Sequence, residues 1–170
     1  MQETKGLGGI HGGMKLTNEY ESNYKKGNKY QDFIVDLFIE TFGIAISCYS
    51  SKENQYNKGE SRQGIEIKFD DILKETGNLY IEIKEKANEN NDSYVDSGIF
   101  RNDNTWLYVI GDYEDIFIFS KKMLQQLYKH KSYEQKTIAT SKGYLLPKEE
   151  AGKYCITYIK GGVNVSNNKK

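Results

Sequence analysis

Cysteine, histidine and proline are scarce in this chain of 170 residues, which contains two cysteines, two histidines and one proline. Cys48 and Cys155 have neither disulfide nor metal-ligand spacing, so we expect two buried thiols in a reducing compartment. His11 and His130 have no Cys or His neighbours at zinc-site spacing, and neither is assigned to catalysis. These absences argue against a disulfide framework and a zinc site.

Long apolar runs are also absent. No run approaches the length of a membrane span and no signal-peptide core is present, so we expect a soluble, cytoplasmic protein. A mass of 19.6 kDa is normal for one domain with one core. We expect a flexible glycine-rich tail over residues 1–16, a single domain over residues 17–160 and a polar C-terminal tail over residues 161–170.

Net charge gives no sign of a nonspecific nucleic-acid binder, because 24 basic residues balance 24 acidic ones. Local groups of lysines precede the helix expected over residues 28–42 and border a later one over residues 121–131. They either line a duplex or form a solvated surface. The fourteen tyrosines likewise either contact nucleic acid or fill strand faces and the edge of the core.

Two segments alternate strictly between apolar and charged residues. Residues 65–70 and 79–86 each have one apolar and one charged side, which is typical of half-buried strands. Gly77 and Asn78 precede the second segment and favour a reversal of direction, so we expect an antiparallel hairpin. In that hairpin the charged sides of both strands coincide.

The register of this hairpin stays open. A turn centred on Thr76 places Asp70 opposite Glu82, a like-charge pair that costs roughly 0.2–1 kcal/mol unless a cation lies between the carboxylates. A turn centred on Glu75 gives cross-strand ion pairs and a purely structural explanation, with Asp70 diagonal to Glu82. Both registers leave the two acids within reach of one divalent ion.

An acid at the end of one strand, followed by Glu-x-Lys on the next, resembles the PD-(D/E)XK nuclease superfamily. Asp70 matches its first acid and Glu82-Ile83-Lys84 matches its Glu-x-Lys, while Phe69 stands where a proline is common. The resemblance is clearest over residues 27–86. It implies a restriction-endonuclease-like α/β fold, in which helices flank a central mixed β-sheet with an αβββαβ core.

A second Glu-x-Lys, Glu66-Ile67-Lys68, competes with the first. It requires an acid on an earlier strand, and only Glu53 or Glu60 is available, in a polar stretch; we therefore favour the second copy. Gln31 stands where the superfamily has an acid on its first helix. A neutral amide can still hold a metal-bound water or orient a carboxylate.

The remaining elements follow from the hydrophobic pattern. Helical spacing predicts a helix over residues 28–42 that stops at Gly43 and leads into a short strand over residues 44–49. Ser120 is expected to cap a second helix. Further strands are expected over residues 106–110, 116–119, 143–147 and 154–158.

The resemblance implies a Mg²⁺ site, with Mn²⁺ as a substitute. Asp70, Glu82 and the backbone carbonyl of Ile83 are expected to be ligands, and Lys84 to orient the attacking water and counter developing charge. Without metal, at least one of the clustered acids should have a raised pKa. Glu66 either serves a second metal or a water, or pairs with Lys84 or Lys86.

These expectations together describe a Mg²⁺-dependent endonuclease acting on DNA, in phage or mobile-element processing, junction resolution or restriction-like cutting. A homodimer is implied by the resemblance alone. The alternative is a non-catalytic module that keeps the nuclease fold for binding nucleic acid or protein, and Gln31 favours it. A third interpretation is an unrelated α+β interaction domain whose charges merely pair across the sheet.

Overall fold

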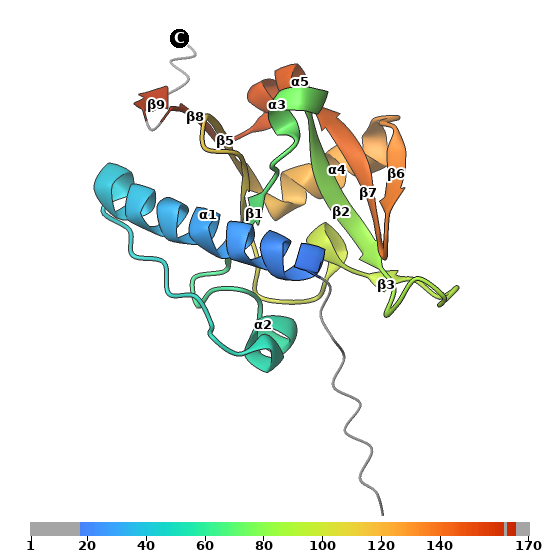
Figure 1. The fold of residues 1–170 in the computed structure, drawn as a ribbon. Coiled ribbons are helices and arrows are strands. Elements are labelled where there is room, and N and C mark those ends of the chain that lie inside the picture. Colours follow the sequence, from blue (N-terminus) through green and yellow to red (C-terminus); the bar gives the residue numbers. More distant parts are fainter. Residues whose placement is uncertain (1–17, 162, 166–170) are drawn as a thin grey trace, which may run out of the picture.

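The computed structural model describes residues 18–161 and 163–165, with side chains over residues 21–161. In this part of the chain the strands form two separate sheets with helices packed around them, an α/β architecture (Figure 1). Several strands contain the continuous or alternating apolar runs that predict them, whereas the short strands over residues 95–96, 135–138 and 163–165 were not expected.

The first sheet has the order β1-β4-β5-β8-β9, so β1 is an edge strand. β1 pairs with β4 in parallel, and the other neighbours are antiparallel. Its strands are β1 (Ile65–Phe69), β4 (Leu107–Gly111), β5 (Asp115–Ser120), β8 (Thr157–Lys160) and β9 (Val163–Val165).

The second sheet is antiparallel throughout and has the order β3-β2-β7-β6. Its register with β7 shifts between Glu82 and Lys84 on β2, which marks a β-bulge. Its strands are β2 (Asn78–Glu85), β3 (Val95–Asp96), β6 (Gln135–Ile138) and β7 (Ser141–Pro147).

The longest helix, α1, ends where the sequence predicts: Gly43 adopts φ 67° and donates its amide to the carbonyl of Ile39 at 3.0 Å. Ser120 caps α4 as expected, accepting from the amide of Met123 at 3.1 Å. The helical segments are α1 (Asn18–Phe42), α2 (Lys52–Lys58), α3 (Leu73–Thr76), η1 (Gly98–Phe100), α4 (Lys121–His130) and α5 (Lys148–Tyr154).

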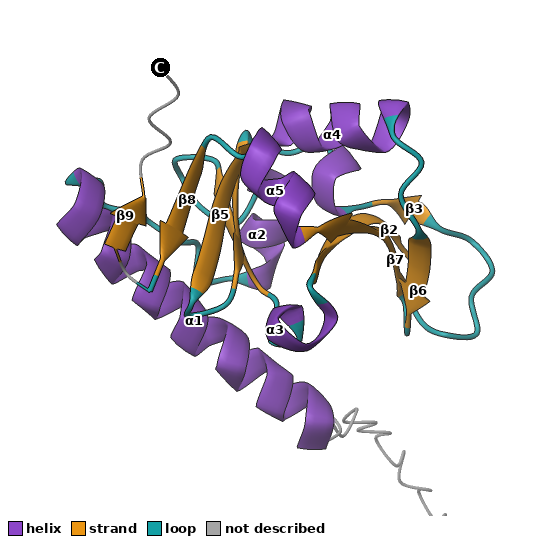
Figure 2. Ribbon diagram, turned by 90° about the horizontal axis from the view of Figure 1, so that it is seen from above, coloured by secondary structure: helices purple, strands orange, loops and turns teal. Residues whose placement is uncertain are grey.

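The two faces of the first sheet bury different cores. Ile34 and Phe38 of α1 pack against Ile65, Val109 and Ile118 of this sheet. On the opposite face, residues of β4 and β5 pack against β2, β7 and α4. Figure 2 shows α1 along one side of the first sheet and the second sheet on the other. Side chains that alternate along β1 therefore point either toward α1 or toward the second sheet.

The expected hairpin of residues 65–70 and 79–86 is wrong. β1 pairs with β4, whereas β2 belongs to the other sheet between β3 and β7. The reason lies in residues 70–77: the amide of Asp70 continues the pairing toward Gly111, and α3 with its left-handed Gly77 carries the chain to the second sheet. The α/β class is confirmed, but two sheets replace the single central one.

Two smaller expectations also fail. The segment of residues 44–49 contains only an isolated bridge between Cys48 and Ser61 rather than a strand. The polar stretch after it contains α2, whose N-cap Ser51 accepts from the amide of Asn54. Cys48 and Cys155 are half-buried and form no disulfide within residues 18–161.

The tail expected over residues 1–16, with His11, lies outside the described residues. At the other end, β9 lies within the segment expected to be a polar tail over residues 161–170. Among the helices described, none combines the length and the apolar character that crossing a membrane requires.

Candidate functional site

A cavity of about 320 Å³ lies between the end of β1 and the middle of β2. Asp70 and Glu82 both line it, and so does Lys68 from β1. Tyr108 and Ile110 of β4 and Gly98 of η1 complete much of the wall. The charged sides of β1 and β2 do meet, as expected, although they meet between two sheets and not within one.

Asp70 follows the last residue of β1 and is only 8% exposed. Its Oδ2 accepts a hydrogen bond from the backbone amide of Tyr80 at 2.9 Å. Burial raises the pKa of Asp70, and the neighbouring carboxylates of Asp71 and Asp112 act in the same direction. No ion pair to Asp70 occurs among residues 21–161, so its charge has no cationic partner there.

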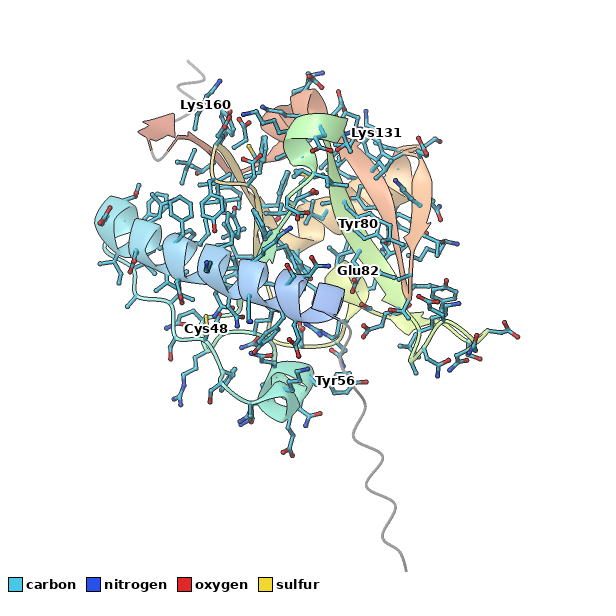
Figure 3. All side chains as sticks on the ribbon, in the orientation of Figure 1. Cys48, Tyr56, Tyr80, Glu82, Lys131 and Lys160 are labelled. Atoms are coloured by element: carbon cyan, nitrogen blue, oxygen red, sulfur yellow. The ribbon has the colours of Figure 1, made fainter. Side chains whose placement is uncertain are left out.

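Glu82 lies in the middle of β2 and is half-buried (Figure 3). Its two carboxylate oxygens accept from two hydroxyls: Ser97 donates to Oε1, and Ser141 donates to Oε2 at 2.9 Å. Ser141 also lies 2.9 Å from the hydroxyl of Tyr80. These contacts from β7 and from the residue before η1 fix the carboxylate without a cation.

Lys68 is the cation of the site. Its Nζ lies 2.9 Å from Oε1 of Glu66 and 3.3 Å from Oε1 of Glu60, and its side chain is 40% exposed. Burial favours the neutral amine, but Glu60, Glu66 and Glu82 together raise the pKa of Lys68. A protonated ammonium therefore stands at the edge of the first sheet, facing the cavity.

Glu66 is fully buried beneath Lys68. Its Oε2 lies 3.6 Å from Nη2 of Arg101 and 3.4 Å from the hydroxyl of Thr105. Burial alone would raise the pKa of Glu66, but Lys68 and Arg101 hold it below its usual value. The expected pairing of Glu66 with Lys84 or Lys86 is wrong, because β1 and β2 lie in different sheets; Glu66 pairs instead with Lys68 of its own strand and with Arg101.

The other predicted site residues lie elsewhere. Lys84 is exposed on β2 beyond the bulge and does not line the cavity. The carbonyl of Ile83 accepts from the amide of Ser97 at 3.1 Å. Gln31 lines a neighbouring cavity together with Glu60 and Lys68, and it also hydrogen-bonds the thiol of Cys48.

The two carboxylates predicted as ligands therefore line one cavity, whereas the predicted lysine, Lys84, lies outside it. The signal for Lys68 was present, because Glu66-Ile67-Lys68 repeats the Glu-x-Lys pattern. Ser97 and Ser141 carried no signal: they are distant from Glu82 in sequence, and only the tertiary fold brings their hydroxyls to its carboxylate.

Few side chains at this site are placed to act as metal ligands. Within the part of the chain that the structure describes, no three His, Cys, Asp or Glu side chains are grouped so that they can hold an ion. A cation here therefore has at most two carboxylate ligands among the described residues, from the three acids that line the cavity, Asp70, Asp71 and Glu82.

Comparison of the chain with protein-family models, with curated proteins and with solved structures finds no match. Function is therefore argued from the site alone.

Proposed function

We propose that the protein is a Mg²⁺-dependent nuclease of the PD-(D/E)XK type, with Asp70 and Glu82 as metal ligands and Lys68 as the lysine of the site. The observation that carries this proposal is the shared cavity of these three residues. Asp70 lines it from the end of β1 and Glu82 from β2, which belong to different sheets, together with Lys68 and Asp71. Asp70 is a buried carboxylate without a cationic partner in residues 21–161.

The residues fit a hard divalent cation. Mg²⁺ usually keeps several waters and takes only one or two protein carboxylates, with substrate phosphate oxygens as further ligands. Two carboxylates meet that requirement, and a cation would also offset the burial cost that raises the pKa of Asp70. When bound, the ion supplies Lewis acidity at the phosphate and activates water.

The residues of the chain supply the remaining tasks. Lys68, held by Glu66 and Glu60, orients a water and counters the negative charge that develops on the phosphate oxygens. Ser97 and Ser141 hold the carboxylate of Glu82 in place. Glu66 is a positioning residue, because it contacts Lys68 and not the cavity.

A direct test combines metal binding with cleavage. Calorimetry with Mg²⁺ or Mn²⁺ is expected to show binding to the wild type and none to Asp70→Ala. Cleavage assays on supercoiled, linear, branched and single-stranded DNA, with RNA in parallel, are expected to show metal-dependent products. Light scattering after size exclusion tests whether two subunits pair, as the resemblance implies.

A non-catalytic binding module is the rival function. One observation favours it: both oxygens of Glu82 are already satisfied by serine hydroxyls. In that case nucleic acid binds with equal affinity in EDTA and in Mg²⁺, and no substrate is cut. That outcome would remove the enzymatic proposal.

A further inference from the structure

A second and larger cavity, of about 450 Å³, adjoins the first. It lies between the first half of α1, α2 and the edge strand β1. Lys68, Phe69 and Asp71 line both cavities, so the two adjoin at the end of β1. A ligand reaching from one to the other would pass the ammonium of Lys68.

The lining of this second cavity is polar and comes mainly from one face of α1. Asn23, Asn28 and Gln31 contribute side-chain amides, each with a donor and an acceptor side by side. Paired donors and acceptors of this kind match the edges of nucleobases. The ring of Tyr24, which is 55% exposed, stands at the same cavity with Nζ of Lys52 5.9 Å from its centroid.

Gly27 gives an independent indication. It lies inside a helix of 25 residues, where glycine is less favourable than alanine, and it lines the cavity. No atom lies within 4 Å of the place where its Cβ would stand, and its φ is not positive. Packing and backbone geometry therefore do not require glycine, whereas a larger side chain would occupy the cavity.

Lys26 of α1 adds a positive charge to the lining of this second cavity. Nζ of Lys26 lies 2.9 Å from Oδ2 of Asp71, and both side chains are about half exposed. Exposed ion pairs contribute little to stability, so a phosphate can compete with Asp71 for this ammonium at small cost.

We propose that the second cavity binds one unstacked nucleobase of a single-stranded nucleic acid, whose backbone runs past Lys68 toward Asp70 and Glu82. The inference rests on the proposed nuclease function for its choice of ligand. The amides contact the edge of the base, the ring of Tyr24 offers a stacking surface, and Lys26 and Lys68 contact the flanking phosphates. A regular duplex presents no unstacked base and fits this cavity poorly.

The test is fluorescence anisotropy in EDTA, which separates binding from cleavage. The probes are a labelled mixed-sequence 12-mer of DNA, the same sequence as RNA, and the blunt DNA duplex. The variant Gly27→Leu fills the cavity, and Gly152→Leu is its matched control, because Gly152 of α5 also has no atom within 4 Å of its Cβ position and does not line the cavity.

We expect the wild type to bind a single strand, as DNA or as RNA, at least about tenfold more tightly than the duplex, and Gly27→Leu to lose about tenfold in affinity, which is within the range for one stacked base. Gly152→Leu should bind like the wild type, and both variants should retain the thermal transition of a folded protein. Equal affinity of Gly27→Leu and wild type, or preference for the duplex, would overturn the inference.

The two proposals can fail separately. A wild type that binds single strands through this cavity but never cleaves them overturns the nuclease and leaves the base-binding cavity. If the wild type cleaves and Gly27→Leu cleaves and binds equally well, the base-binding cavity is overturned and the nuclease proposal is kept.

Discussion

The carboxylate of Asp70 accepts a hydrogen bond from the backbone amide of Tyr80 at 2.9 Å, which ties the end of β1 to the start of β2. The two strands belong to different sheets. Tyr80 and Glu82 are alternate residues of β2, so their side chains leave the same side of the strand about 7 Å apart. Because a strand's N–H lies in the plane of its sheet, this hydrogen bond holds Asp70 against the edge of β2, and both Asp70 and Glu82 line the cavity between the strands.

Lys68 and Lys84 should differ sharply in their effect on cleavage. Lys68→Gln is expected to lower kcat by about 100-fold or more, because a preorganised cation at the developing charge is lost. Lys84→Gln should change kcat little, since this side chain is exposed and outside the cavity. Single-turnover cleavage with Mg²⁺ measures both, and circular dichroism confirms that each variant is folded. A loss in Lys84→Gln as large as in Lys68→Gln would contradict the assignment of Lys68 alone as the lysine of the site.

Asp70→Asn should raise the melting temperature of the metal-free protein at neutral pH. The folded-state pKa of Asp70 is raised, so its charged form costs stability above that pKa, and the cost disappears as the pH falls through it. Scanning calorimetry in EDTA should therefore show a difference at pH 7 that shrinks on acidification. Addition of Mg²⁺ should stabilise the wild type and leave the variant unchanged. A variant that melts lower than the wild type at pH 7 would contradict this explanation.

Local sequence patterns predicted the positions of the strands better than which strands pair with each other. β1, β4 and β5 lie within a residue or two of the expected strands, because alternation and apolar runs are properties of the segment itself. The parallel pairing of β1 with β4 depends on residues some forty positions apart. No local signal specified it, and a tight hairpin was the simpler expectation.

The residues of the candidate site were likewise predicted only in part. Asp70 and Glu82 were predicted to lie together because charged residues alternate with apolar ones on both segments, and they do line one cavity, although the expected hairpin does not form. Which lysine lines the cavity depends on which part of each strand faces the other sheet. On β2 the pairing with β7 shifts between Glu82 and Lys84, so the two residues do not keep a regular strand spacing. Both features depend on the tertiary fold, so the local sequence pattern did not predict them.

Glu66→Ala should be among the most destabilising substitutions in the site. It leaves Lys68 without its nearest partner and removes one partner of Arg101, in a pair whose acid is fully buried. Breaking a buried ion pair from one side typically costs about 3–5 kcal/mol. Urea unfolding measures this loss. The matched control is Glu114→Ala, whose partner Lys74 is exposed, and it should leave the midpoint unchanged.

Stability should fall as the pH drops below the ordinary carboxylate range. Burial favours the protonated forms of Glu66, Asp103 and Asp115, but their cationic partners lower all three pKa values. The stability that these groups contribute is complete above their unfolded-state pKa values and is lost as the pH falls through the folded ones. Urea midpoints at pH 7, 4 and 3 should decrease in that order. Asp103→Asn should show a shallower decrease, because the variant no longer has the titrating carboxyl that pairs with Lys121 and Arg101.

Gly98→Ala should disrupt the site by displacing Glu82. Gly98 adopts φ 49°, and a Cβ there would overlap the carbonyl of Glu82 and lie 2.9 Å from its Cβ. Because the obstacle is mainly backbone, β2 or η1 must shift, and the carboxylate of Glu82 shifts with them. Gly77→Ala is the control: its φ is 66°, with no atom within 4 Å, so it incurs only the left-handed penalty of about 1–2 kcal/mol. Urea unfolding should show a larger loss for Gly98→Ala, and calorimetry should show loss of metal binding in that variant alone. Equal losses of stability would mean that the contact between Gly98 and Glu82 does not constrain the strand.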